Sequence, residues 1–127
     1  MVAIMPWVSH RLSRARLIQD YKAGLVSREA VQDADFLLLA AADFHGYPSS
    51  AACPICGEKE MRTVYWVYGD ELKSRAGTAR SLEEIDAFAA EGLTFDLHEV
   101  EVCTSCKWNY LLRTSTVLPA SGFQPGV

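Results

Sequence analysis

The sequence has no apolar run near the roughly 20 residues that a helix needs to cross a bilayer, so we expect no membrane partner. It also lacks the GxSxG, HExxH, Walker-type and GxGxxG motifs of common hydrolases, metalloproteases and nucleotide-binding proteins. Its three histidines, His10, His45 and His98, are isolated, and no Ser or Cys has a context typical of an activated nucleophile. We therefore predict that the protein is not an enzyme.

Cations are also scarce. The chain carries 12 Lys and Arg against 16 Asp and Glu, a formal net charge of −4. A dedicated nucleic-acid-binding domain is normally basic, so the composition argues against one. The N-terminal residues lack the basic start of a secretory signal peptide, which predicts a cytoplasmic protein with reduced cysteines.

The few cations are unevenly placed. Residues 1–32 hold five basic and two acidic side chains, a net of +3, whereas the rest of the chain sums to −7. The basic segment is either a set of solvated helix faces or an arm that docks on a partner. In the second case, four cations of the first predicted helix are expected to contact RNA or protein: Arg11, Arg14, Arg16 and Lys22.

What the chain does contain is the composition of one domain, with 50% hydrophobic and 22% charged residues in 127. Caps and apolar spacing predict helices over 10–23, over 27–32 and from Asp33 or Asp35 to Gly46. The third helix is apolar nearly all round, which predicts burial on more than one side. Because it has no Lys or Arg, a DNA-binding regulator is kept only as an alternative function.

From Ser49 onward the pattern favours strands. Runs of β-branched and aromatic residues predict strands over 61–68, 94–102 and 108–118. A change in the apolar phase of the second run predicts a β-bulge near His98 and Glu99. Ser81 and Glu84 form a capping box, which predicts a helix over 81–90. Residues 119–127, rich in Pro and Gly, are expected to form a mobile tail.

All four cysteines fall into two Cys-x-x-Cys pairs, Cys53 with Cys56 and Cys103 with Cys106. Two intervening residues allow a tight turn that points both sulfurs at one centre, and two such turns supply the four thiolates of a structural zinc site. Between Cys56 and Cys103 lie 46 residues, so the fold must bring the two pairs together. Antiparallel pairing of the strand after Cys56 with the strand before Cys103 would place both turns at one end of the sheet.

We therefore predict an α+β fold in which N-terminal helices, residues 1–48, pack on a three-stranded antiparallel zinc-ribbon sheet with an inserted helix, residues 49–118, as one folding unit. The predicted cofactor is Zn, in a closed site without a Lewis-acid role. An iron-loaded or redox-active Cys₄ protein is the alternative, whereas two disulfides are disfavoured in a reducing compartment.

Two further features have more than one interpretation. Residues 75–80 form either an anion-binding loop before the predicted Ser81 helix or a solvated connection. The aromatic residues of the strands either fill the core or leave an open face for a protein or single-stranded nucleic acid. They are Tyr65, Trp66, Tyr68, Trp108 and Tyr110.

A set of short motifs covers most of the chain between Leu12 and Leu118. They are Asp33–Asp35 with the Leu-rich helix into Phe44–Gly46, Pro48–Ser49, Cys53–Cys56, Trp66–Gly69, Ala76–Ser81, Val100–Cys103 and Cys106–Asn109. Together they resemble an uncharacterised actinobacterial family, a domain of unknown function predicted to be a zinc ribbon. Members of that family often carry a further Cys just before the Asp-Ala pair, where Gln32 stands here, so such a Cys is not needed as a ligand. The resemblance supports one cytosolic unit and implies little about activity.

The combined hypothesis is a non-enzymatic zinc-ribbon adaptor that docks on transcription or translation machinery, either RNA polymerase or the ribosome. It relies on analogy with small bacterial zinc ribbons. The acidic body favours a protein surface as the partner, and contact with RNA is expected only from the basic N-terminal helix.

Overall fold

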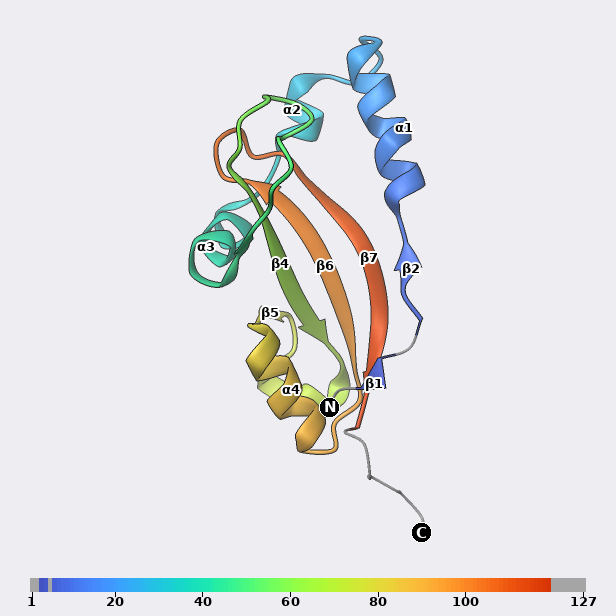
Figure 1. The fold of residues 1–127 in the computed structure, drawn as a ribbon, viewed down its shortest axis with the longest axis vertical. Coiled ribbons are helices and arrows are strands. Elements are labelled where there is room, and N and C mark those ends of the chain that lie inside the picture. The colour runs from blue at the N-terminus through green and yellow to red at the C-terminus, as the bar shows by residue number, and fades with distance from the viewer. Residues whose placement is uncertain (1–2, 5, 120–127) are drawn as a thin grey trace.

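A computed structural model describes residues 3–4 and 6–119, and Figure 1 shows an antiparallel sheet flanked by helices. The sheet runs in the order β1-β7-β6-β4-β3, with β2 on β7 and β5 on β4. Its long strands are β4 (Met61–Tyr68), β6 (Phe95–Cys103) and β7 (Asn109–Leu118). Four strands have two residues each: β1 (Ala3–Ile4), β2 (Val8–Ser9), β3 (Tyr47–Pro48) and β5 (Thr78–Ala79).

The predicted mixture of helices and antiparallel sheet is confirmed, but a three-stranded sheet is wrong, because the described residues form seven strands. The three long strands are those that the sequence predicts. The other four are too short to show a period of two, so no sequence pattern marks them. Of the predicted tail, residues 120–127 lie outside the described residues.

The helices lie where the caps predict them. They are α1 (Arg11–Lys22), α2 (Arg28–Val31), α3 (Phe36–His45) and α4 (Leu82–Ala90), with a 3₁₀ segment, η1 (Asp70–Arg75), before β5. The side chains of Ser27 and Asp35 accept hydrogen bonds from the first turns of α2 and α3. Ser81 and Glu84 make both bonds of a capping box. At α1, Ser9 accepts only from the Arg11 N–H, and His10 is the cap residue.

The two faces of the sheet are covered differently. In Figure 1, α1 and α2 lie near one end of the long strands and α4 lies at the other end. Ile85 and Phe88 of α4 pack with Leu97 and its neighbours on one face. Helix α3 covers part of the opposite face, where Ala41 and Ala42 cluster with Val64.

Helix α3 corrects a prediction. Burial on more than one side is wrong, because Phe36, Leu37 and Phe44 are 81%, 69% and 82% exposed. Small side chains, Ala41 and Ala42, face the sheet and let the helix backbone approach it closely. Leu38 and Leu39 pack partly against the sheet, but Phe36, Leu37 and Phe44 remain largely in solvent. The helix therefore has an apolar face without a described partner.

The predicted bulge is confirmed in place but lies on the other strand. Glu99 pairs with Arg113 and Val100 with Leu111, so Leu112 is the extra residue, on β7. The change of apolar phase in β6 has a different cause. Glu99 and Glu101 continue the buried face that Leu97 belongs to, and each is only 6% exposed. Because two residues of this buried face are carboxylates, the apolar pattern of the strand is interrupted there. The interruption looks like a change of phase in the sequence.

Candidate metal site

The two cysteine pairs meet at one end of the sheet. Met61, the first residue of β4, pairs antiparallel with Cys103, the last residue of β6. The turn that precedes β4 therefore lies beside the turn that follows β6. All four sulfur atoms lie within 4.8 Å of one another. The predicted antiparallel pairing and the predicted convergence of Cys53, Cys56, Cys103 and Cys106 are both present.

The sulfur positions fit a tetrahedral ion. The Sγ atoms of Cys53 and Cys106 are 3.7 Å apart, as are those of Cys56 and Cys103. A tetrahedron with Zn–S bonds of about 2.3 Å has edges of about 3.8 Å. A disulfide would bring two sulfurs to about 2.05 Å, and all four cysteines are free. The geometry therefore suits four thiolates around one metal.

Both turns have the same backbone construction. The N–H groups of Gly57 and Lys107 donate to the carbonyls of Cys53 and Cys103 at 2.9 and 3.0 Å. Gly57 has a φ of +80° and Lys107 a φ of +74°. Each turn thus closes through a left-handed residue directly after its second cysteine. Glycine adopts this conformation freely, whereas lysine does so at a cost.

The electrostatics of the sulfurs differ between positions. Burial raises the pKa of the Cys53 and Cys103 thiols, although backbone N–H groups of their own turns oppose this. Burial acts to raise the pKa of Cys106, but hydrogen bonds from the Trp108 backbone, the Gln32 side chain and the neighbouring cysteines together leave that pKa lowered. Metal binding requires thiolates. The N–H donors around the turns thus favour the form that binds a cation.

The cysteine end is packed against the N-terminal helices. Cys53, Cys103 and the fully buried Trp108 form one apolar cluster with Val31 of α2 and Met61 of β4. Partly buried side chains of α1 contact the same cluster: Leu17, Ile18 and Tyr21. Two of the four sulfurs are therefore shielded from water, while Cys56 is exposed.

A buried carboxylate beside this cluster is a feature that the sequence analysis missed. Glu101 Oε2 accepts hydrogen bonds from Trp108 Nε1 at 2.7 Å and from Arg14 Nε at 2.6 Å. Arg14, one of the four cations expected to face a partner, is thus engaged within the fold. Arg11, Arg16 and Lys22 are exposed.

Glu99 forms a second network on the same face. It accepts from Tyr65 Oη at 2.9 Å and from Arg113 Nε at 2.7 Å. The Arg113 guanidinium lies 3.9 Å from the ring centre of Trp7. Burial and the nearby Glu99 raise the pKa of Tyr65 to about 12. These partners hold the N-terminal segment on the sheet.

The predicted anion-binding loop has its guanidinium groups engaged. Arg75 pairs with Glu91 at 3.1 Å and Arg80 with Glu84 at 2.9 Å. Both guanidinium groups also lie over the ring of Phe88. Residues 75–80 therefore contact α4 through both arginines. This arrangement favours a structural connection over an anion-binding site.

Fold and site together define an α+β protein with a four-cysteine centre that can hold one metal ion. The chain belongs to the family of unknown function DUF5318, whose model matches residues 3–124. This confirms the resemblance to an uncharacterised actinobacterial family. The uncharacterized proteins Rv0049 of Mycobacterium tuberculosis and Mb0050 of Mycobacterium bovis are each 36% identical over 118 residues, which cover 93% of this chain and 86% of theirs.

No solved structure matches the chain. Among the helices of the described residues, none has both the length and the apolar character needed to cross a bilayer.

Proposed function

We propose that this protein is a non-enzymatic zinc-ribbon adaptor in which Cys53, Cys56, Cys103 and Cys106 hold one Zn²⁺. The observation that carries the proposal is the convergence of four sulfurs within 4.8 Å, with two inter-turn distances of 3.7 Å. Four thiolates in a tetrahedron are a preferred ligand set of structural zinc. A single iron would use the same set and is the alternative occupant.

The metal would join the two cysteine turns without doing chemistry. Four protein ligands leave no open position for water or substrate, so the ion would have no Lewis-acid role. The bound site would carry about two negative charges, because four thiolates surround a divalent ion. The cations nearest in sequence to the turns are Lys59, Arg62 and Lys107.

The proposed partner is a gene-expression complex of the cytoplasm, either RNA polymerase or the ribosome. Analogy with small bacterial zinc ribbons supports this choice. The acidic body suits a protein surface, and the exposed cations Arg11, Arg16 and Lys22 suit a limited contact with RNA.

The metal assignment is tested by elemental analysis of the purified full chain. We expect about one zinc per chain, no visible absorbance, and unfolding of the cysteine end on chelation. Cys103→Ser, which replaces a buried ligand, should reduce the zinc content strongly. A coloured protein with stoichiometric iron would contradict zinc, and a metal-free protein with unchanged stability would contradict a structural metal.

The adaptor role is tested by native pull-down from cytosol, with ribosomes and RNA polymerase resolved separately. We expect the tagged chain to enrich one of them. The double variant Arg11→Glu and Arg16→Glu should bind more weakly and with a flatter salt dependence than the wild type. Arg28→Glu, an exposed cation on α2, is the control. Enrichment of neither complex would contradict the adaptor role, and an unchanged salt slope would contradict contact with RNA.

A further inference from the structure

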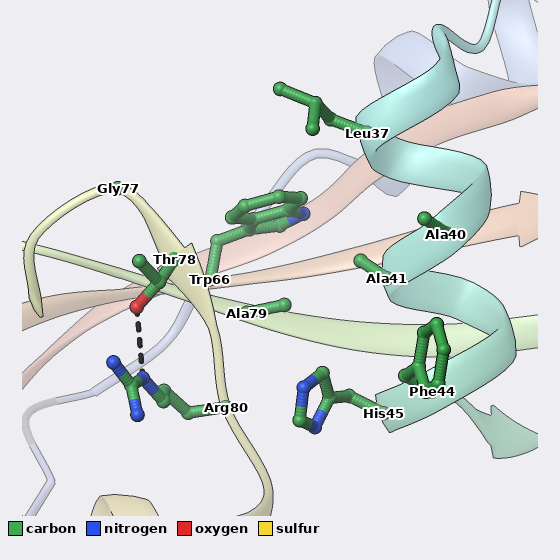
Figure 2. A pocket seen from close by; sticks show the side chains of 10 residues that line it. All are labelled: Leu37, Ala40, Ala41, Phe44, His45, Trp66, Gly77, Thr78, Ala79 and Arg80. Atoms are coloured by element: carbon green, nitrogen blue, oxygen red, sulfur yellow. Dashed lines mark hydrogen bonds between the residues drawn. The ribbon is translucent and has the colours of Figure 1, made fainter.

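An apolar groove runs beside α3 on the sheet face that α4 does not cover. It has a volume of about 480 Å³ and is lined by Leu37, Ala40 and Phe44 of α3, Trp66 of β4 and Ala79 of β5, among others. Figure 2 shows Trp66 between α3 and the segment that carries Thr78 and Arg80. We call this concavity the α3 groove.

The side chains that α3 adds to the groove, Leu37 and Phe44, are not part of the packed core. Leu37 and Phe44 are 69% and 82% exposed. The side of α3 that contacts the sheet is formed by the buried Ala41 and Ala42, with Leu38 and Leu39 partly buried beside them. Single exposed apolar residues are ordinary, but large ones gathered around a concavity mark interaction sites. Phe44 and Trp66 are also the residue types that dominate the energy of protein interfaces.

The α3 groove continues into an acidic pocket of about 400 Å³, which shares Leu37 and Trp66 with it. The added lining includes Asp33, Asp35, Tyr68 and His98, and no Lys or Arg is among the described residues that line it. The rings of Tyr68 and His98 lie 4.6 Å apart. One end of the surface is therefore apolar and the other combines carboxylates with aromatic rings.

The neighbouring charges do not cancel this acidity. Asp33 accepts a hydrogen bond from the neutral Asn109, and Asp35 accepts from the backbone of Leu38. Arg80, at the far end of the α3 groove, is already paired with Glu84. The Lys107 carbonyl accepts a hydrogen bond from the Ala34 N–H, but the Lys107 side chain is exposed and does not line the pocket.

We propose that the α3 groove and its acidic pocket bind a segment of a partner protein that presents apolar side chains followed by Lys or Arg. The apolar side chains lie against Leu37 and Phe44. The cation lies near the carboxylates of Asp33 and Asp35 and the faces of Trp66 and Tyr68, where opposite charge and aromatic rings both attract it. The phosphates of a nucleic acid would be repelled there.

This inference rests on the adaptor function proposed above, because it describes the surface with which the adaptor would bind its partner. It commits to a basic, apolar partner and not to a second copy of this chain. Residues 33–127 carry a net charge of −7, so two copies that meet through these faces would bring like charges together. A dimer is accordingly one of the outcomes that the experiment can show.

The test uses the zinc-loaded full chain and a labelled helical peptide of Leu and Lys. The peptide has about 18 residues, or five turns, with Leu at spacings of three and four. Fluorescence anisotropy should show binding that weakens with salt, and a peptide with Glu in place of Lys should not bind. Leu37→Ser and Phe44→Ser should each weaken binding about fivefold or more, as expected of interface anchors. Asp33→Asn should weaken it and flatten the salt dependence.

Matched controls come from exposed residues elsewhere. Leu12→Ser on α1, where Leu12 is 79% exposed, and Glu83→Gln on α4 should bind the Lys peptide as the wild type does. Zinc content and near-UV circular dichroism verify that each variant is folded. Equal losses in groove and control variants, or equal binding of the Glu peptide, would overturn the proposal. So would a dimer in sedimentation that Phe44→Ser abolishes.

The groove and the adaptor role can fail separately. If the wild type enriches neither ribosome nor RNA polymerase, the adaptor role fails, and the peptide result still decides the groove. If Leu37→Ser and Phe44→Ser enrich the same complex as strongly as the wild type, the groove is wrong and the adaptor role stands.

Discussion

Arg14 Nε lies 2.6 Å from Glu101 Oε2, and the same oxygen accepts a hydrogen bond from the indole of Trp108 at 2.7 Å. Trp108 follows Cys106 by two residues and is fully buried beside Cys53 and Cys103. The Glu101 carboxylate therefore links α1 to the end of the sheet where the cysteines lie. The basic N-terminal helix is an integral part of this core as well as a charged surface.

Removing the arginine of this pair should destabilise the fold. In Arg14→Met, the Glu101 carboxylate stays buried with its Trp108 bond but without a countercharge. Arg14 is 21% exposed, so water replaces part of the lost interaction, and we expect a loss of about 2 kcal/mol, below the range for fully buried pairs. Urea denaturation measures it. Arg16→Met, an exposed cation on the same helix, should change stability by less than about 0.5 kcal/mol; equal effects in the two variants would refute the coupling.

Gln32 should tune metal affinity without being a ligand. Its side chain helps to lower the pKa of the Cys106 thiol, although burial acts in the opposite direction. Groups that hydrogen-bond to metal ligands typically contribute 10- to 100-fold in affinity, so Gln32→Leu should weaken zinc binding about tenfold in competition with a chelator. Gln19→Leu, an exposed change on α1, should leave affinity unchanged. A Gln32→Leu protein with wild-type affinity would show that the contact does not matter.

The two cysteine turns offer a paired backbone experiment. Lys107 is left-handed, with a φ of +74°, so Lys107→Gly should stabilise the protein by about 0.5–1 kcal/mol after the larger entropy of glycine in the unfolded chain is counted. Gly57→Lys should destabilise it by about 1 kcal/mol. A Cβ at Gly57 meets no atom within 4 Å, so backbone conformation alone is tested. Thermal unfolding of the zinc-loaded proteins measures both, and shifts of the same sign would contradict a backbone origin.

Stability should fall on mild acidification, in part through His98. Burial lowers the pKa of His98, with a smaller opposing effect from Asp96. The folded state therefore favours neutral His98, and the unfolded chain binds the extra proton first as the pH falls. The contribution is complete well above the unfolded pKa of about 6.5 and is lost as the pH falls from that value through the lower pKa of the folded state. His98→Gln should reduce the slope of unfolding free energy between about pH 7.5 and 5.5 in zinc-saturated protein. A slope identical to that of the wild type would exclude His98 as the source.

Sequence patterns predict the parts of this fold that local chemistry determines. Ser27, Asp35 and the Ser81–Glu84 capping box mark helix starts because each supplies a partner for free backbone N–H groups. The cysteine pairs identify the metal site because four unrelated cysteines rarely fall into two pairs of equal spacing. Pairing of β4 with β6 follows once the two turns must meet.

Features that depend on distant neighbours are not predictable in this way. Glu99 and Glu101 are buried because Arg113, Tyr65, Arg14 and Trp108 come from other elements to satisfy them. A single sequence does not show which distant residues will pair with these carboxylates. In the sequence they therefore look like a break in the alternating apolar pattern of the strand. The exposed large side chains of α3 are a similar case. Composition predicts burial, whereas a sheet contact made by Ala41 and Ala42 leaves Phe36, Leu37 and Phe44 outside.

The separation of the two cysteine pairs also bears on how the protein matures. Residues 53–56 leave the ribosome long before residues 103–106, and for that interval the nascent chain offers only two cysteine thiolates. Two thiolates cannot complete a tetrahedral site, so the choice of ion would wait until β6 has emerged and paired with β4. In the proposed site, metal selection would thereby be a late event of biosynthesis, decided by the paired strands and not by a short local peptide.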